Sequence, residues 1–166
     1  MNRRSNRAEL LEVIGKLRRE IPGITLRTTL IAGFPGETED EAMQTVDLVE
    51  KTQFDALFTF IFSPRPGTPA AKMDDPVSRE EKQVWFEKLV DAQNAISAKK
   101  HAAYIGRTVK VLVDGESDDE AFPLTARTEG NRLVRMKGDK ALIGTFAKAK
   151  ITDSNTWALY GEAVEE

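Results

Sequence analysis

Cysteine is absent from this 166-residue chain, and histidine occurs once, at His101. Without thiolates the chain cannot form a disulfide, a cysteine-ligated zinc site or a cysteine-ligated iron–sulfur cluster. A lone histidine cannot build a zinc site, because such a site takes several ligands, and we expect His101 at a solvated helix position. The composition therefore predicts no metal-binding residue.

Long apolar runs and a strong excess of one charge are also missing. No stretch approaches the roughly 18 apolar residues of a membrane-spanning helix, and we expect no signal peptide. The formal net charge of −3 gives no overall attraction toward nucleic acid. We therefore expect a cytoplasmic protein of one or two domains, with no membrane partner.

A glycine-rich turn organises the first part of the chain. An apolar run over residues 24–32 leads into Ile-Ala-Gly-Phe-Pro-Gly-Glu-Thr at residues 31–38. Gly33 and Gly36 permit backbone angles that a Cβ forbids and let a ligand approach the main chain. The pattern predicts a strand, a turn and a helix, and α/β proteins bind ligands at such a turn. A tight turn without a ligand fits the same residues.

The other expected elements of this part follow from hydrophobic period and capping signals. Helices are predicted over 6–21, 39–52 and 78–103, and strands over 24–32 and 54–62. The almost continuously apolar run 54–62 is typical of a strand buried on both faces in a parallel sheet. The proline-rich residues 63–69 cannot be regular structure, and we expect them on the same rim as the glycine-rich turn. Arg65 on this loop could bind a carboxylate or phosphate, or lie in solvent.

From residue 107 the hydrophobic period changes to two. Short strands are predicted near 107–113, 124–128, 132–136, 146–151 and 157–161, with an acidic turn over 114–120. Five short strands in about 60 residues predict a small closed or half-open β-barrel. The fold class is thus α/β plus all-β, with domains at 1–103 and 104–166.

Basic residues gather within the expected barrel, in the span 127–150. We select Arg127, Arg132, Arg135 and Lys137 as candidate RNA contacts, because a one-sided basic face is typical of phosphate binding. A solvated barrel surface would explain the same charges. Period two places Arg132 on one face of its strand and Arg135 on the other, and we expect Leu133 to share the inward face with Arg135.

Several segments resemble the radical-SAM methylthiotransferases, and the tRNA-modifying members more than those that modify a ribosomal protein. The segments are Met1–Arg4, the turn 31–38, residues 54–71, residues 125–128 and 131–134, and Gly161–Glu162. The resemblance covers essentially the whole chain. It implies the C-terminal part of a radical-SAM partial (β/α)6 TIM-like barrel, followed by a small five-stranded TRAM β-barrel that binds tRNA.

The resemblance also implies a cofactor and site residues. The residues that would line the S-adenosylmethionine pocket are Ile31, Gly33, Phe34, Pro35, Gly36 and Glu37. Arg3, Arg4 and Arg65 would lie on the substrate rim. In the family, two 4Fe–4S clusters and S-adenosylmethionine serve to methylthiolate C2 of N6-isopentenyladenosine beside the anticodon.

The cysteine-bearing parts of that family are not in this sequence. We therefore expect a C-terminal fragment that contains no catalytic residue, binds no cofactor alone and is inactive by itself. A barrel cut in this way leaves an unpaired strand edge, so we also expect self-association. A free-standing, non-catalytic RNA-binding or scaffolding protein built from the same parts remains the alternative.

Overall fold

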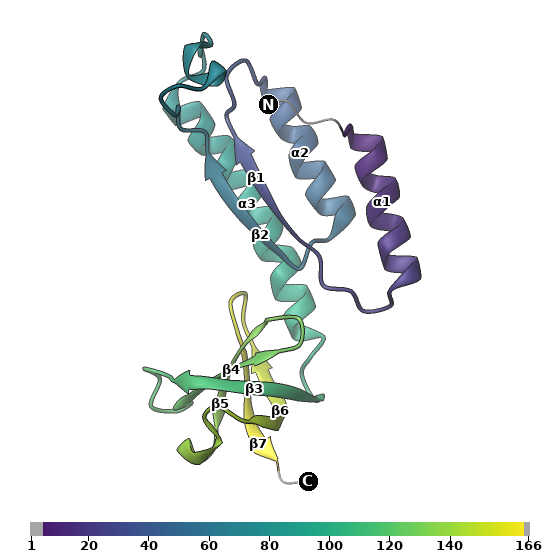
Figure 1. The fold of residues 1–166 in the computed structure, drawn as a ribbon, viewed down its shortest axis with the longest axis vertical. Coiled ribbons are helices and arrows are strands. Elements are labelled where there is room, and N and C mark those ends of the chain that lie inside the picture. The colour runs from purple at the N-terminus through teal and green to yellow at the C-terminus, as the bar shows by residue number, and fades with distance from the viewer. Residues whose placement is uncertain (1–4, 165–166) are drawn as a thin grey trace. The chain divides into compact units, whose positions relative to one another are not determined.

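The computed structural model describes residues 5–164. These residues divide into two compact units, with the division between Ile96 and Ser97 (Figure 1). The elements of the first unit are α1 (Arg7–Glu20), β1 (Arg27–Ala32), α2 (Glu39–Thr52), β2 (Ala56–Ile61), the short helix η1 (Pro69–Lys72) and most of α3 (Arg79–Ala102). The second unit contains the end of α3, strands β3 (Thr108–Glu116), β4 (Leu124–Thr128), β5 (Leu133–Lys137), β6 (Phe146–Ser154) and β7 (Leu159–Val164), and η2 (Lys140–Leu142). The α/β part and the all-β part are both confirmed. The boundary at 103/104 stays a prediction.

Local capping signals set the starts of the three long helices. Asn6 and Glu9 form a capping box at α1, and Thr38 and Glu41 form one at α2. At α3 the Ser78 Oγ accepts a hydrogen bond from the Glu81 backbone N–H, and the Glu81 carboxylate accepts from the Ser78 backbone N–H. Each box satisfies backbone donors that a helix start leaves without partners. All three expected starts are confirmed.

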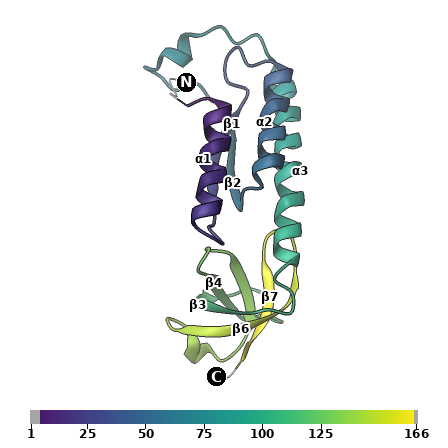
Figure 2. The same ribbon diagram turned by 90° about the vertical axis from the view of Figure 1, so that its right-hand side faces the viewer.

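Strands β1 and β2 pair in parallel, with Thr29 opposite Phe58 and Ile31 opposite Phe60. Figure 2 shows α2 and α3 together on one side of the two strands. Val49 of α2 and Leu89 of α3 lie in the core under them. The core of the unit therefore lies between these helices and one face of the sheet.

The expectation that residues 54–62 are buried on both faces is wrong. Phe58 and Phe60 are 55% and 56% exposed, whereas Phe54, just before the strand, is buried. Within residues 5–164 the helices cover one face of the sheet, and the side chains of the other face meet solvent. Apolar side chains on a covered face and on an uncovered face look the same in sequence.

We expect the open sheet to drive self-association, because exposed apolar strands with free edges pair with other chains. The average mass from light scattering should rise with protein concentration. Replacing Phe58 and Phe60 together by Ser should return the chain to a monomer. A clean monomer for the wild-type chain across a wide concentration range would count against this prediction.

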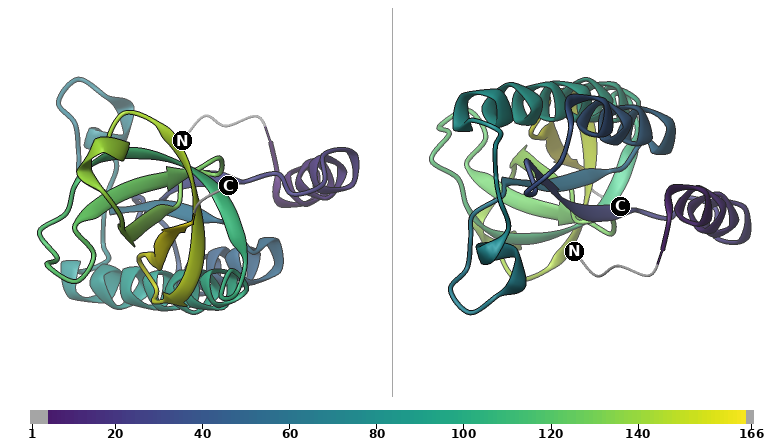
Figure 3. Two further views of the ribbon diagram at one scale, coloured as in Figure 1. Left: turned by 90° about the horizontal axis from the view of Figure 1, so that it is seen from below. Right: turned by 90° about the horizontal axis from the view of Figure 1, so that it is seen from above.

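The five strands of the second unit close into a barrel in the order β3-β4-β5-β7-β6, which Figure 3 shows from below. Its interior is filled by side chains at alternate positions; they are Val111, Val113, Leu124, Ala126, Val134, Met136, Ala149, Ile151 and Leu159. Two expectations are corrected. β3 continues through Glu116 into the supposed acidic turn, and Val134 and Met136 point inward, so Leu133 and Arg135 point away from the interior.

His101 is buried and not solvated as expected. It is 6% exposed, and its Nδ1 lies 2.8 Å from the Asn155 carbonyl oxygen in the β6–β7 connection. Burial lowers the pKa of His101, and the nearby Arg132 charge lowers it further, while the hydrogen bond with Asn155 acts in the opposite direction. The neutral imidazole is therefore the form that the fold favours.

We expect the stability of the second unit to fall as the pH drops. A lowered folded-state pKa means that the unfolded chain binds more protons than the folded chain below about pH 6.5. Stability is therefore complete above that pH and decreases below it. Thermal unfolding at pH 7.5 and pH 5.5 measures this loss, and His101→Gln should reduce it. An equal pH dependence in wild type and variant would contradict the assignment.

Candidate functional site

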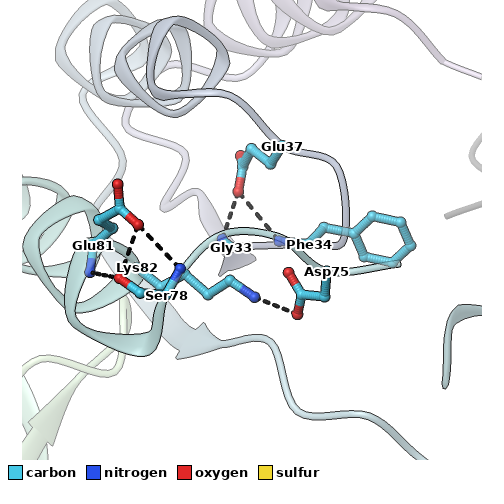
Figure 4. Close-up of polar contacts among 7 residues, drawn as sticks. All are labelled: Gly33, Phe34, Glu37, Asp75, Ser78, Glu81 and Lys82. Carbon is cyan, nitrogen blue, oxygen red and sulfur yellow. Dashed lines mark hydrogen bonds and ion pairs between the residues drawn. The ribbon is translucent and has the colours of Figure 1, made fainter. Parts of the chain in front are cut away.

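The glycine-rich turn closes on itself through Glu37 (Figure 4). Its carboxylate accepts hydrogen bonds from the backbone N–H groups of Gly33 and Phe34, the second at 3.2 Å. The Glu37 backbone N–H donates in turn to the Phe34 carbonyl at 2.8 Å. The two N–H groups that follow β1 are therefore engaged by this side chain.

The environment of Glu37 favours its protonated form relative to a free carboxyl. Partial burial raises the pKa of Glu37 and outweighs the two backbone hydrogen bonds, which lower it. The neighbouring Glu41 adds a smaller increase, and Lys82 a smaller decrease. The turn thus holds a half-buried carboxyl at the carboxyl end of β1, where ligands bind in α/β folds.

Lys82 of α3 packs against the same turn, a role that its sequence position did not lead us to expect. Its side chain is 7% exposed and forms an ion pair with Asp75. Its Cβ, Cγ and Cδ atoms fill the space that a side chain at Gly33 would need. A signal existed in the sequence, because Lys82 precedes the buried Trp85 by three residues and so lies on the apolar stripe of α3.

The turn and the proline-rich loop meet at the carboxyl edge of the sheet, as expected. The Phe34 and Phe62 rings pack edge to face, with centroids 5.2 Å apart. Beside them lies a hollow of about 360 Å³ lined by residues that include Pro64, Asp75 and Lys82. Arg65 is exposed on the loop. Arg3 and Arg4, the other expected rim residues, lie outside the described residues.

The expected pocket residues differ in their exposure to solvent. Pro35 is buried and Gly36 is exposed. Ile31 pairs with Phe60 in the parallel ladder, and Leu30 beside it packs into the helix-covered core. Because side chains alternate along a strand, Ile31 belongs to the open face of the sheet.

The four basic residues selected in the barrel separate into different environments. Arg127 forms an ion pair with Asp114 at 3.1 Å, and the Arg135 Nη1 donates to the Ser117 Oγ at 3.0 Å. The Lys137 ammonium lies 5.5 Å from the centroid of the Phe122 ring.

Arg132 differs from the other three because it is only 8% exposed. Its guanidinium lies 5.4 Å from the centroid of the Tyr104 ring. Arg132 is therefore the least exposed of the four selected residues.

The closed barrel with an alternating interior defines a recognisable class of domain. Residues 102–164 match the family model of the TRAM domain. The second unit is therefore a closed five-stranded β-barrel that matches the TRAM domain, and the first unit is an α/β layer with parallel strands.

The chain is also similar along its length to particular enzymes. It is 46% identical over 165 residues to the tRNA-2-methylthio-N(6)-dimethylallyladenosine synthase of Thermoanaerobacter sp. (strain X514), covering 99% of this chain and 35% of that relative. It is 44% identical over 166 residues to the synthase of the same name from Bacillus cytotoxicus, covering 100% and 33%. The chain thus spans about a third of the length of these relatives and corresponds to the C-terminal portion of such methylthiotransferases.

The residues present can be tested against the cofactors that the resemblance implies. The sequence offers no thiolate to an iron–sulfur cluster, and residues 5–164 contain no cluster of three or more His, Asp or Glu side chains suited to a metal ion. A cluster therefore does not fit this chain. For S-adenosylmethionine, the polar donors of the turn are engaged by Glu37, while the open apolar face at Ile31 suits a flat ring.

Among the residues that the structure describes, no helix is both long enough and apolar enough to cross a bilayer.

Proposed function

We propose that this chain is the C-terminal part of a tRNA methylthiotransferase. In that enzyme the TRAM barrel binds the tRNA, and the α/β layer forms part of the wall of the catalytic barrel. The observation that carries the proposal is the similarity along the entire chain to enzymes named as tRNA-2-methylthio-N(6)-dimethylallyladenosine synthases. The substrate class is N6-isopentenyladenosine beside the anticodon, and the setting is cytoplasmic.

In the proposed enzyme the α/β layer forms an apolar wall of the S-adenosylmethionine pocket and donates no hydrogen bonds to the cofactor. Ile31, on the open face of the sheet, contacts the adenine of S-adenosylmethionine. Glu37 keeps the turn from Gly33 to Gly36 in shape, because its carboxylate occupies the two backbone donors. S-adenosylmethionine bound to the complete enzyme would supply the radical chemistry, and the residues of this chain would position it. Cysteines outside this chain hold the clusters, and this chain alone is inactive.

In the TRAM barrel, Arg127, Arg135 and Lys137 contact tRNA phosphates. Arg127 and its partner Asp114 are both about two-fifths exposed, and ion pairs at that exposure contribute little to stability. A phosphate can therefore replace the carboxylate at small cost. Arg132 is not one of these contacts, because it is buried against Tyr104.

We expect the 166-residue chain to bind tRNA weakly and with a strong salt dependence. Contacts with phosphate release counterions, so affinity should fall at least about tenfold between 50 mM and 200 mM salt. Replacing Arg127 and Lys137 together by Ala should weaken binding and make the salt dependence less steep, with a change in slope of about two.

Filter binding or fluorescence anisotropy at several salt concentrations tests both parts. No detectable tRNA binding at low salt would overturn the proposed function. Binding by the wild type with an unchanged slope in the double variant would reject these contacts and leave the function standing.

A further inference from the structure

A second surface of the barrel lies on the outer faces of β3 and β6. In their antiparallel ladder, Lys110 pairs with Lys148, Leu112 with Phe146, and Thr108 with Lys150. Val111 and Ala149 are fully buried within the barrel, so by alternation the paired lysines and Phe146 point outward. In each pair the two residues lie more than thirty positions apart in the sequence. The surface continues through Leu112, which pairs with Phe146 on one side and with Arg127 on the other, to Arg127 on β4.

Positive charge and an exposed aromatic ring lie together on this surface. Like charges placed directly opposite each other on neighbouring strands repel, and Lys110 faces Lys148 in this way. Phe146 is 67% exposed, so its ring gains little from the hydrophobic effect. The Lys110 ammonium lies 4.4 Å from the centroid of that ring. One exposed face therefore carries two lysines and an aromatic ring whose surface remains accessible to a ligand.

A hollow adjoins the ring and the lysines. It has a volume of about 720 Å³, and Lys110, Lys148 and Phe146 lie on its border. Its apolar lining comes from Leu142, Ala147, Ala163 and Val164, and Asp139 supplies one carboxylate. The site thus combines cations for a phosphate, a flat ring and an apolar recess next to it.

We propose that this surface binds an unpaired stretch of RNA, with one base stacked on Phe146 and the adjacent phosphates on Lys110 and Lys148. Exposed aromatic rings set among basic residues are the usual means of holding single-stranded nucleic acid, and base faces are accessible only where an RNA is not paired. The proposal rests on the proposed function, because it specifies which part of an RNA the TRAM barrel takes and where.

Lysine and phenylalanine make separate contributions, and these can be measured separately. Stacking on an aromatic ring is insensitive to salt, whereas phosphate contacts set the salt slope. Phe146→Ala should therefore weaken binding of a stem-loop RNA by at least about fivefold, with the slope retained. Lys110→Ala combined with Lys148→Ala should lower the slope by about 1.4, the value for two phosphates of a single strand.

The experiment uses the 166-residue chain, a stem-loop RNA and a blunt duplex with the sequence of the same stem. Trp157→Ala is the matched control, because Trp157 is equally bare at 71% exposed and lies in the β6–β7 connection. Phe146→Trp keeps an aromatic ring and should retain stem-loop affinity. The thermal midpoint of each variant verifies that the barrel is folded.

The expected result is a loss confined to the stem-loop in Phe146→Ala, with Trp157→Ala and Phe146→Trp close to wild type. Unchanged stem-loop affinity in a folded Phe146→Ala chain would overturn the proposal, and so would an equal loss on the duplex. In either case, RNA binding by the wild-type chain would still support the proposed function. A wild-type chain that binds neither RNA would overturn both.

Discussion

Gly161→Ala is expected to destabilise the TRAM barrel more than any other change considered. Gly161 is buried in β7, between Met136 of β5 and Ile151 of β6. A Cβ at this position would overlap the carbonyl oxygen of Lys150 and lie 3.3 Å from the Cα of Ile151. These atoms belong to the backbone of a paired strand, so they cannot move aside without breaking the ladder that closes the barrel.

The expected cost is about 3 kcal/mol or more of unfolding free energy, at the upper end for overpacking because backbone is displaced. Chemical unfolding followed by far-ultraviolet circular dichroism measures it. Gly144→Ala is the matched control, since a Cβ there meets nothing within 4 Å and the change costs only the positive φ of 84°, about 1 kcal/mol. An equal loss of unfolding free energy in the two variants would contradict the close backbone contact between β6 and β7.

Gly33→Ala is expected to give the second largest loss, in the first unit. Gly33 has a φ of 73°, and a Cβ would lie 2.5 Å from both Cγ and Cδ of Lys82. The lysine side chain would have to leave its place and so give up its ion pair with Asp75. Backbone strain and displaced packing together should cost about 3 kcal/mol.

Gly36→Ala is the control for backbone strain, because its φ is 83° and no atom lies within 4 Å of the added Cβ. We expect it to cost about 1 kcal/mol. Trp85 is buried in the first unit, and its fluorescence reports unfolding of that unit in a Trp157→Phe background. Combining Gly33→Ala with Lys82→Ala should cost less than the sum of the two single changes. If the unfolding free energies lost in the two single variants simply add in the double variant, Gly33 and Lys82 are not energetically coupled and the proposed contact is wrong.

Local features were predicted well because neighbouring residues decide them. The capping boxes at Asn6, Thr38 and Ser78 each act over four residues, and all three helices begin where those signals place them. The alternation of Val111 and Val113 with Lys110 and Leu112 predicted β3. The five short strands predicted a closed or half-open barrel, and the structure has the closed form. The resemblance to methylthiotransferases rests on the order of sequence segments along the chain, which does not depend on the tertiary structure.

Features that depend on distant segments were predicted poorly. The run 54–62 was expected to be covered on both sides, yet whether Phe58 meets a helix or solvent depends on which elements are present opposite it. His101 and Arg132 are residue types that usually lie on the surface. Both are buried here, with His101 against Asn155 and Arg132 against the Tyr104 ring.

The sequence by itself determined the helix starts, the change from period 3.6 to period two, the absence of cysteine and the similarity to the C-terminal portion of methylthiotransferases. The tertiary structure alone decided that Glu37 closes the turn, that Lys82 fills the space beside Gly33, and that Lys110 and Phe146 share one face. The reason is physical. Capping and hydrophobic period act between residues a few positions apart, whereas burial, ion pairing and strand register depend on which distant segments the fold brings into contact.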